Sequence, residues 1–273
     1  MTVTSQSTST TAPNFDDEMF IVEGVISNLE VAQGTENLLQ KLDKRYKGKS
    51  ALTGVGAVVG GMYGQVANAA MLAMYNGEDT ENFICKIDEQ VVCGTFGGAS
   101  KLPQGKKVKA VVQKQGDVLV AKGILSEDKG FVWISHAWGW KAERATNFKL
   151  AWWAYAFGML GMFLIGGMVL GFGADAFWEL IQITAIGGAV ICFGLAFWNS
   201  STMNTFADPA TEVFRKLGFA NPEKVNLNSY RYGIVYIHEL VQNYESDSEH
   251  FNIHCYKKAI EDGKLKMASE SGA

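Results

Sequence analysis

Two adjacent apolar segments, 150–172 and 177–197, constrain the fold of this chain more than any other feature. A helix needs about 20 apolar residues to cross the roughly 30 Å hydrocarbon core of a bilayer. At a rise of ~1.5 Å per residue, the two segments would span about 34 and 31 Å. They predict a transmembrane helical hairpin at 150–198. The alternative, a buried hairpin of a soluble domain, would need further protein over every face of both helices.

Tryptophans gather at the ends of these segments. Trp152 and Trp153 stand at the start of the first, Trp178 at the start of the second and Trp198 at its end. An indole at a membrane interface buries its ring while its N–H stays hydrated. We therefore expect these four side chains to lie at the interfaces.

Basic residues flank the hairpin and are absent from its link, 173–176, which carries only Asp175 as a charged residue. The basic residues are Lys141, Arg144 and Lys149 before the first segment, and Arg215 and Lys216 after the second. Basic residues favour the cytoplasmic side of a membrane. The pattern predicts a multi-pass protein with both termini in the cytoplasm.

Both apolar segments are rich in glycine, and Gly167 and Gly171 form one GxxxG pair. Small residues let helix backbones approach closely. The pair predicts either tight packing of the hairpin on itself or oligomerisation of several copies. Two helices cannot enclose a pore, so a channel would require an oligomer.

Residues 20–149 predict a cytoplasmic β-domain. Alternating apolar residues indicate short strands, and turn residues such as Asp88-Glu89 and Gly97-Gly98 separate them. The expected strands are 20–27, 83–87, 90–95, 107–113, 117–125 and 130–135. Closely spaced strands of this kind favour a small antiparallel barrel or sandwich, OB- or SH3-like.

A Gly/Ala-rich stretch, 51–75, is inserted after the first of these strands and contains the glycine zipper Gly56, Gly60 and Gly64. It is long enough to span a membrane. A third crossing would, however, place the β-domain and the N-terminus on opposite sides, against the charge pattern. We expect a helix that packs on the barrel or lies at the membrane surface. The predicted fold class is thus an α+β membrane protein.

The ends of the chain are polar. Residues 1–19 lack a secretory signal and predict a disordered leader. Residues 199–273 predict a cytoplasmic helical segment and tail. Within it, Asp208 and Pro209 indicate the N-cap and first position of a separate helix, 208–217. A further helix is expected within 230–260, and disorder from Lys264.

Composition and motifs exclude several function classes. A net charge of −4 and a pI of about 5.6 argue against nucleic acid as a partner. The glycines of 94–98 lack the spacing of a phosphate-binding loop, and no G-x-S-x-G or H-E-x-x-H motif occurs. We expect neither an enzyme nor a cofactor.

Three features of the sequence are candidate chemical sites. His250 and His254 would share a face of a helix and, with Cys255, form a metal-like cluster, but further ligands are missing and surface histidines are the alternative. His136 could act as a general base only with a carboxylate partner, and the sequence shows none. Cys85 and Cys93 fall on adjacent expected strands and could lie close together, although a reduced setting is the simpler interpretation.

The layout resembles a bacterial family of type VI secretion system effectors, which combine a strand, an Ala/Gly-rich segment, a small β-region, two membrane helices and a cytoplasmic tail. The resemblance covers about 20–228 and rests on four stretches: FIVEGVISNLE, GVGAVVGGMYG, FICKIDEQVVCGTFGG and VFRKLGFANPEKVNL. It implies a bacterial inner-membrane protein associated with type VI secretion. It carries over no site residue, and residues beyond 230 depart from it.

Three functions are compatible with this sequence. The first is a resident immunity-type protein that acts against a delivered protein toxin. The second is a pore-forming effector that inserts into a target membrane and forms a homo-oligomer through its glycines. The third is a membrane-anchored ligand-binding or sensor module. We expect the lipid bilayer to be a partner in all three.

Overall fold

Five strands close a small barrel in the computed structural model, which describes residues 18–33, 80–115, 118–232 and 252–268. The strands are β1 (Met19–Gln33), β2 (Glu81–Ile87), β3 (Gln90–Phe96), β4 (Lys107–Gln115) and β5 (Val118–Ser126). Their order is β3-β2-β1-β4-β5, and a parallel β3–β5 pair closes the barrel. This is the connectivity of a five-stranded Greek-key barrel of the OB type. The prediction of a small barrel is confirmed, except that the closing pair is parallel.

The first strand serves two neighbours because it bends. Its N-terminal half pairs with β4 and its C-terminal half with β2. The register against β2 shifts between Ser27 and Glu30, and Asn28 there has a positive φ of 50°. Such an irregularity bends a strand and lets a small sheet curl into a barrel.

Two further strands extend the sheet beyond the barrel. β6 (Phe131–Ile134) was expected, and β7 (Ile253–Cys255) was not. The predicted helix within 230–260 is therefore wrong at β7, although the short helix α6 (Tyr256–Glu261) follows directly. The prediction of disorder from Lys264 is wrong for residues 264–268, because Ala220 N–H donates to the Lys266 carbonyl and Ala268 N–H to the Gly218 carbonyl.

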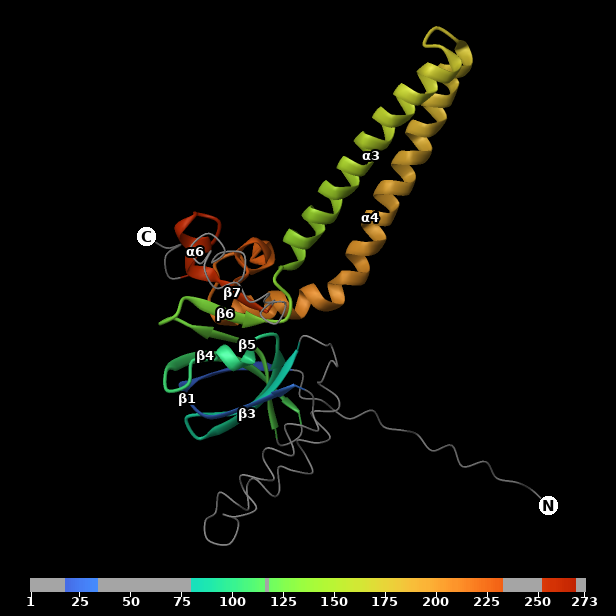
Figure 1. Cartoon of the computed structure of the whole chain (residues 1–273). Coiled ribbons are helices and arrows are strands. Elements are labelled where there is room, and N and C mark those ends of the chain that lie inside the picture. The colour runs from blue at the N-terminus through green and yellow to red at the C-terminus, as the bar shows by residue number, and fades with distance from the viewer. Residues whose placement is uncertain (1–17, 34–79, 116–117, 233–251, 269–273) are drawn as a thin grey trace, which may run out of the picture.

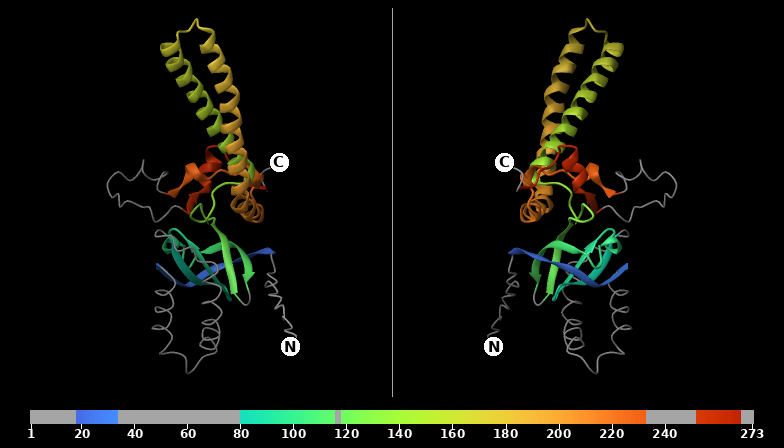
Figure 2. Two further views of the ribbon diagram at one scale, coloured as in Figure 1. Left: turned by 90° about the vertical axis from the view of Figure 1, so that its right-hand side faces the viewer. Right: turned by 90° about the vertical axis from the view of Figure 1, so that its left-hand side faces the viewer.

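The two apolar segments form the long helices α3 (Trp140–Leu170) and α4 (Asp175–Leu217), side by side in all three views (Figures 1 and 2). Gly171, at a φ of 81°, ends α3 and starts the turn. The expected separate helix 208–217 is wrong, because α4 continues through Pro209. Proline removes one helical hydrogen bond and bends a helix. Figure 1 shows the C-terminal part of α4 turning away from the line of the pair onto the sheet.

Two hydrophobic cores hold the domain together. The first fills the barrel and includes Val22, Phe83, Val112 and Ile124. The second lies between the outer face of β4–β6 and the C-terminal end of α4. Its members include Val111, Leu125, Val132, Val213, Phe214 and Leu217. A Cβ on Gly123 would lie 2.5 Å from Val213, so this glycine lets α4 approach the sheet closely.

Three short 3-10 helices complete the described chain: η1 (Ala99–Lys101), η2 (Pro222–Lys224) and η3 (Asn228–Tyr230). Together with β7, α6 and the residues up to Ala268, η2 and η3 form what we call the C-terminal lobe. Figures 1 and 2 place this lobe beside the lower end of the helix pair, on the side of the barrel from which the pair projects.

The helix pair is exposed along its apolar length. Within the most apolar 18-residue stretch of each helix, only 11% of α3 and 6% of α4 is buried by the rest of the protein. Side chains such as Met168, Ile183 and Val190 are 69–77% exposed. A hairpin in the core of a soluble domain would be mostly buried. Both helices are long and apolar enough to cross a membrane.

Candidate functional site

The helix base, where β6 leads into α3 and α4 returns to the sheet, is built from polar contacts. The Trp140 N–H donates to the Thr211 hydroxyl at 3.1 Å, and that hydroxyl donates to the Ala207 carbonyl at 2.7 Å. The first N–H groups of a helix have no partner within the helix. A side chain of α4 thus satisfies one of these groups in α3 and fixes the two helices to each other.

A histidine–carboxylate pair lies at the same place. His136 Nε2 is 2.6 Å from an oxygen of Glu143, whose side chain is buried in the first turn of α3. The ring of His136 also meets the edge of Trp138 and lies near Phe206. The sequence did not reveal this partner, because seven residues and a change from strand to helix separate the two side chains.

Such a pair is half of what a general base requires, and the other half is a substrate position within reach of the ring. The pair joins the β6–α3 link to the first turn of α3. We therefore interpret it as a positioning contact.

The C-terminal lobe is attached at the helix base by a close backbone contact. A Cβ on Gly139 would lie 2.2 Å from the Pro222 carbonyl oxygen, so no other residue fits there without a shift of the backbone. Gly139 N–H donates to the Val225 carbonyl at 2.9 Å. Trp138 Nε1 donates to Asn226 at 2.7 Å. The lobe, the barrel and the helix pair therefore meet at one junction.

The two helices meet mainly through aromatic and small side chains. Phe193 of α4 lies within 6.0–6.5 Å of Phe148, Trp152 and Tyr155 of α3, measured between ring centres. Nearer the base, the Asn147 amide donates to the Ser200 hydroxyl at 3.3 Å. The interface is thus specific enough to hold the pair in one arrangement.

The glycines singled out from the sequence occupy different environments. Gly167 packs against the ring of Phe172, and Gly171 lies in the turn beyond α3, so this GxxxG pair does not form one continuous helix face. A Cβ on each of four other helix glycines would meet no atom within 4 Å: Gly158, Gly161, Gly187 and Gly194. Gly56, Gly60 and Gly64, with the whole of 51–75, lie outside the described residues.

The four tryptophans predicted at interfaces are all exposed. Trp152 and Trp153 lie twelve and thirteen residues after the start of α3, Trp198 lies near the middle of α4, and Trp178 lies near the tip of the pair. Twenty residues separate Trp178 from Trp198. At the helical rise this is about 30 Å, the thickness of the hydrocarbon core of a bilayer.

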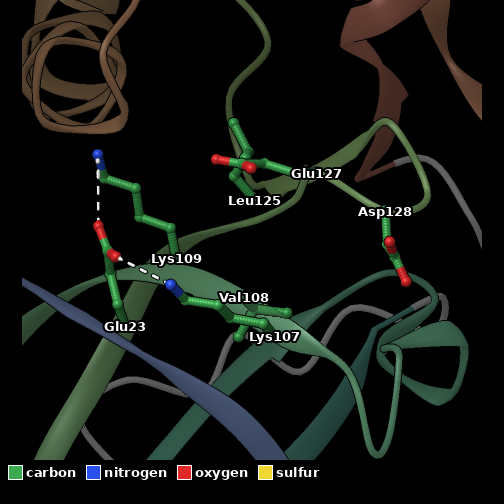
Figure 3. A pocket seen from close by; sticks show the side chains of 7 residues that line it. All are labelled: Glu23, Lys107, Val108, Lys109, Leu125, Glu127 and Asp128. Carbon is green, nitrogen blue, oxygen red and sulfur yellow. Dashed lines mark ion pairs between the residues drawn. The ribbon is translucent and has the colours of Figure 1, made fainter.

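A polar cavity of about 280 Å³ lies on the barrel between β1, β4 and the turn after β5 (Figure 3). Figure 3 shows Lys107 and Lys109 on either side of Glu23, with Nζ–carboxylate distances of 3.8 Å for each lysine. Asp128 pairs with Lys106 at 3.0 Å, which lowers the pKa of this carboxyl group. The cavity presents charges of both signs.

The cysteines of the barrel are free and inert. In the β2–β3 register Cys85 faces Val92 and Cys93 faces Ile84, so the two thiols point to opposite faces of the sheet. Burial raises the pKa of each thiol to about 12, even though Lys122 lies near Cys93. Neither is a thiolate near neutral pH, and the thiolate is the form that reacts.

His254 lies in β7 and not on a helix, so its predicted pairing with His250 on one helix face is wrong; His250 itself is outside the described residues. Its ring is buried and donates from Nδ1 to the Leu227 carbonyl at 3.1 Å. Burial lowers the pKa of His254 to about 4, and the nearby Arg231 adds to this shift. No group of residues suited to a metal ion occurs in the part of the chain that the structure describes.

Acidification from pH 6.5 to 4 is expected to destabilise the C-terminal lobe. The folded state keeps His254 neutral down to a pKa of about 4, whereas an unfolded histidine titrates near 6.5. The unfolded chain therefore binds more protons in this window, and stability falls with pH by about 3 kcal/mol in total. Hydrogen exchange of the β7 amides at several pH values measures this loss.

His254→Asn is the control for this pH effect, because its amide can still donate to the Leu227 carbonyl but does not titrate. Exchange in this variant should be nearly independent of pH over the same window, after correction for the intrinsic exchange rate. An equal pH dependence in both proteins would show that another group is responsible.

Comparison with protein-family models, with curated proteins and with solved structures finds no match to this chain.

Proposed function

We propose that α3 and α4 anchor this protein in a bacterial inner membrane as a transmembrane hairpin, with the barrel and both termini on the cytoplasmic side. The exposure of apolar side chains along both helices carries this proposal. Water would leave that surface without a partner, whereas lipid matches it. The ~30 Å between Trp178 and Trp198 supports the same placement.

The charges support the orientation. Lys141, Arg144 and Lys149 lie on α3 at or before the start of its apolar part, and the turn at the tip has only Asp175 and Glu179 nearby. Basic residues remain on the cytoplasmic side during insertion. The barrel emerges from the same end of the pair, so it would lie against the cytoplasmic surface.

Within this setting we assign the protein a non-enzymatic recognition role. The resemblance of the sequence to a type VI secretion family supplies the context, and in that context the role is that of a resident immunity-type protein whose barrel binds a delivered toxin. A resident role is favoured over a delivered one because the folded helix pair exposes its apolar surface at once. A protein in transit would need that surface covered.

Competition between sister cells tests this role. A strain lacking the protein should lose viability when it is mixed with the parent strain, and the intact chain should restore survival. Charge reversal at Lys107 and Lys109, which line the barrel cavity, should abolish protection without lowering the amount of protein in the membrane. Full survival of the deletion strain would exclude an immunity role and leave a pore-forming effector or a ligand-binding or sensor module.

A pore-forming effector is the second candidate, favoured by the four outward-facing glycines Gly158, Gly161, Gly187 and Gly194. Open glycines on a membrane helix let a second copy approach closely. Expression of the chain alone in a naive bacterium would then collapse the membrane potential, as read with a voltage-sensitive dye. Leucine at these four positions, or at Gly56, Gly60 and Gly64, should restore the potential. Polarised cells with the protein in the membrane exclude autonomous pore formation.

A further inference from the structure

A second cavity, of about 220 Å³, lies in the C-terminal lobe. Its walls come from two segments that are distant in sequence: the chain around η2 and the residues after α6. The lining residues are Asn221, Lys224, Val225, Gly263, Lys264, Leu265 and Lys266. No part of the function proposed above uses this cavity.

Backbone hydrogen bonds hold the two walls together. Ala220 N–H donates to the Lys266 carbonyl at 2.9 Å, and Ala268 N–H donates to the Gly218 carbonyl at 2.7 Å. Leu265 and Val225 are buried in the second core, while Lys264 and Lys266, on either side of Leu265, are exposed. The alternation of an extended chain thus directs both lysines away from the core.

The cavity carries positive charge without acidic residues in its lining. Lys264 and Lys266 form no ion pair with any residue that the structure describes, and Lys224 forms none either, although its charge helps to lower the pKa of the neighbouring Glu223. The neighbouring lysines differ, because Lys141 pairs with Glu223 at 3.2 Å and Lys258 with Asp262 at 3.3 Å. Three lysines in the lining of one cavity match an anion with several oxygen atoms, such as a phosphate.

The position of the cavity relates it to the membrane. The segment containing Lys224 packs at the start of α3, as the Gly139–Val225 hydrogen bond shows. From Trp140 to Leu150, the first strongly exposed apolar residue of α3, the helix rises about 15 Å. The views in Figures 1 and 2 agree that the lobe lies beside this polar stretch, on the side to which the helices project. The lobe that contains the cavity therefore lies on the membrane-facing side of the barrel, beside the polar stretch that precedes the apolar surface of α3.

We propose that this cavity binds the phosphate of an anionic phospholipid headgroup in the leaflet at the helix base. The inference rests on the membrane placement proposed above. Free phosphate offers the same chemistry, but only a lipid headgroup would be held beside the lysines by the membrane itself. Each basic residue near an anionic surface strengthens attraction to it, and salt weakens that attraction.

The test uses the full chain, purified in detergent and placed in nanodiscs of phosphatidylcholine with or without 30% phosphatidylglycerol. Native mass spectrometry after release counts the lipids that stay bound. The intact protein should retain phosphatidylglycerol over phosphatidylcholine by at least tenfold, and added salt should reduce this preference. Replacement of Lys224, Lys264 and Lys266 by glutamine should remove it, and arginine at the same positions should restore it.

A matched triple variant carries the same loss of charge elsewhere, with glutamine at Lys86, Lys101 and Lys114 on β2, η1 and β4. It should keep the lipid preference of the intact protein. Equal retention by the two triple variants would overturn the lipid site. A second measurement tests binding of inorganic phosphate at millimolar concentration. If phosphate binds and depends on the three lysines, but the protein shows no preference for phosphatidylglycerol, the assignment to lipid is also overturned. Failure to enter pure phosphatidylcholine nanodiscs would refute the membrane placement, which is a separate result.

Discussion

Arginine at Ile183 and Ile186 is expected to prevent stable insertion of α4 into the membrane. Both side chains are about 70% exposed on the helix pair, so an arginine at either position would find no protein partner. Ile186 lies eight residues after Trp178 and twelve before Trp198, about 12 and 18 Å along the helix and thus near the bilayer centre. Each arginine there costs about 2.5–3.5 kcal/mol of insertion free energy.

The fraction of protein that remains in the membrane pellet after an alkaline carbonate wash measures this effect. Asn204→Arg is the matched control, since this residue is exposed on the same helix but lies beyond Trp198. If α4 lay in water, arginine at Ile183 and Ile186 and arginine at Asn204 would be tolerated alike. The hairpin proposal predicts a large loss for the double variant and none for the control. Carbonate-extractable wild-type protein, or equal behaviour of the two variants, would contradict it.

Trp133→Ala is expected to destabilise the barrel by about 3–5 kcal/mol, the usual cost of deleting a large aromatic side chain from a core. Trp133 lies on β6, outside the five closing strands, yet its side chain is fully buried in the barrel core. Its Nε1 donates to the Gly98 carbonyl at 3.2 Å, which ties β6 to the turn after β3.

Urea-dependent proteolysis of the chain in detergent would report this change through cleavage of the barrel. Trp133→Phe keeps most of the apolar volume and loses the hydrogen bond, so it should cost about 1–2 kcal/mol. We expect the alanine variant to be the least stable, the phenylalanine variant to be intermediate and the wild type to be the most stable. A neutral alanine variant would mean that β6 does not contribute to the barrel core.

The local sequence pattern was sufficient to predict two kinds of element: strands that bury one face, and apolar helices that need not be buried in the protein. The six expected strands all occur, because period-two alternation in residues such as Val108, Ala110 and Val112 directs side chains into the barrel. The two apolar segments form helices for an equally local reason. A helix satisfies the backbone hydrogen bonds within its own segment, so it needs no partner segment.

Predictions failed where a distant segment outweighed the local signal. Asp208 and Pro209 have the form of a helix start, but Ala210, Val213 and Phe214 pack on the sheet, so one helix continues through the proline. The residues around His254 show mixed spacing and form a strand only because β6 offers a free edge.

The sequence by itself therefore determined the strands, the apolar helices, the placement of tryptophans at the ends of the apolar segments and the uneven distribution of basic residues. Tertiary structure alone decided barrel closure through β3–β5, the His136–Glu143 pair, and the lysine cavity built from η2 and the chain after α6. The physical reason is the sequence range over which each signal acts. Periodicity and charge act over a few neighbouring residues, whereas a closing strand pair or a shared cavity joins residues whose separation in sequence carries no signal of their contact.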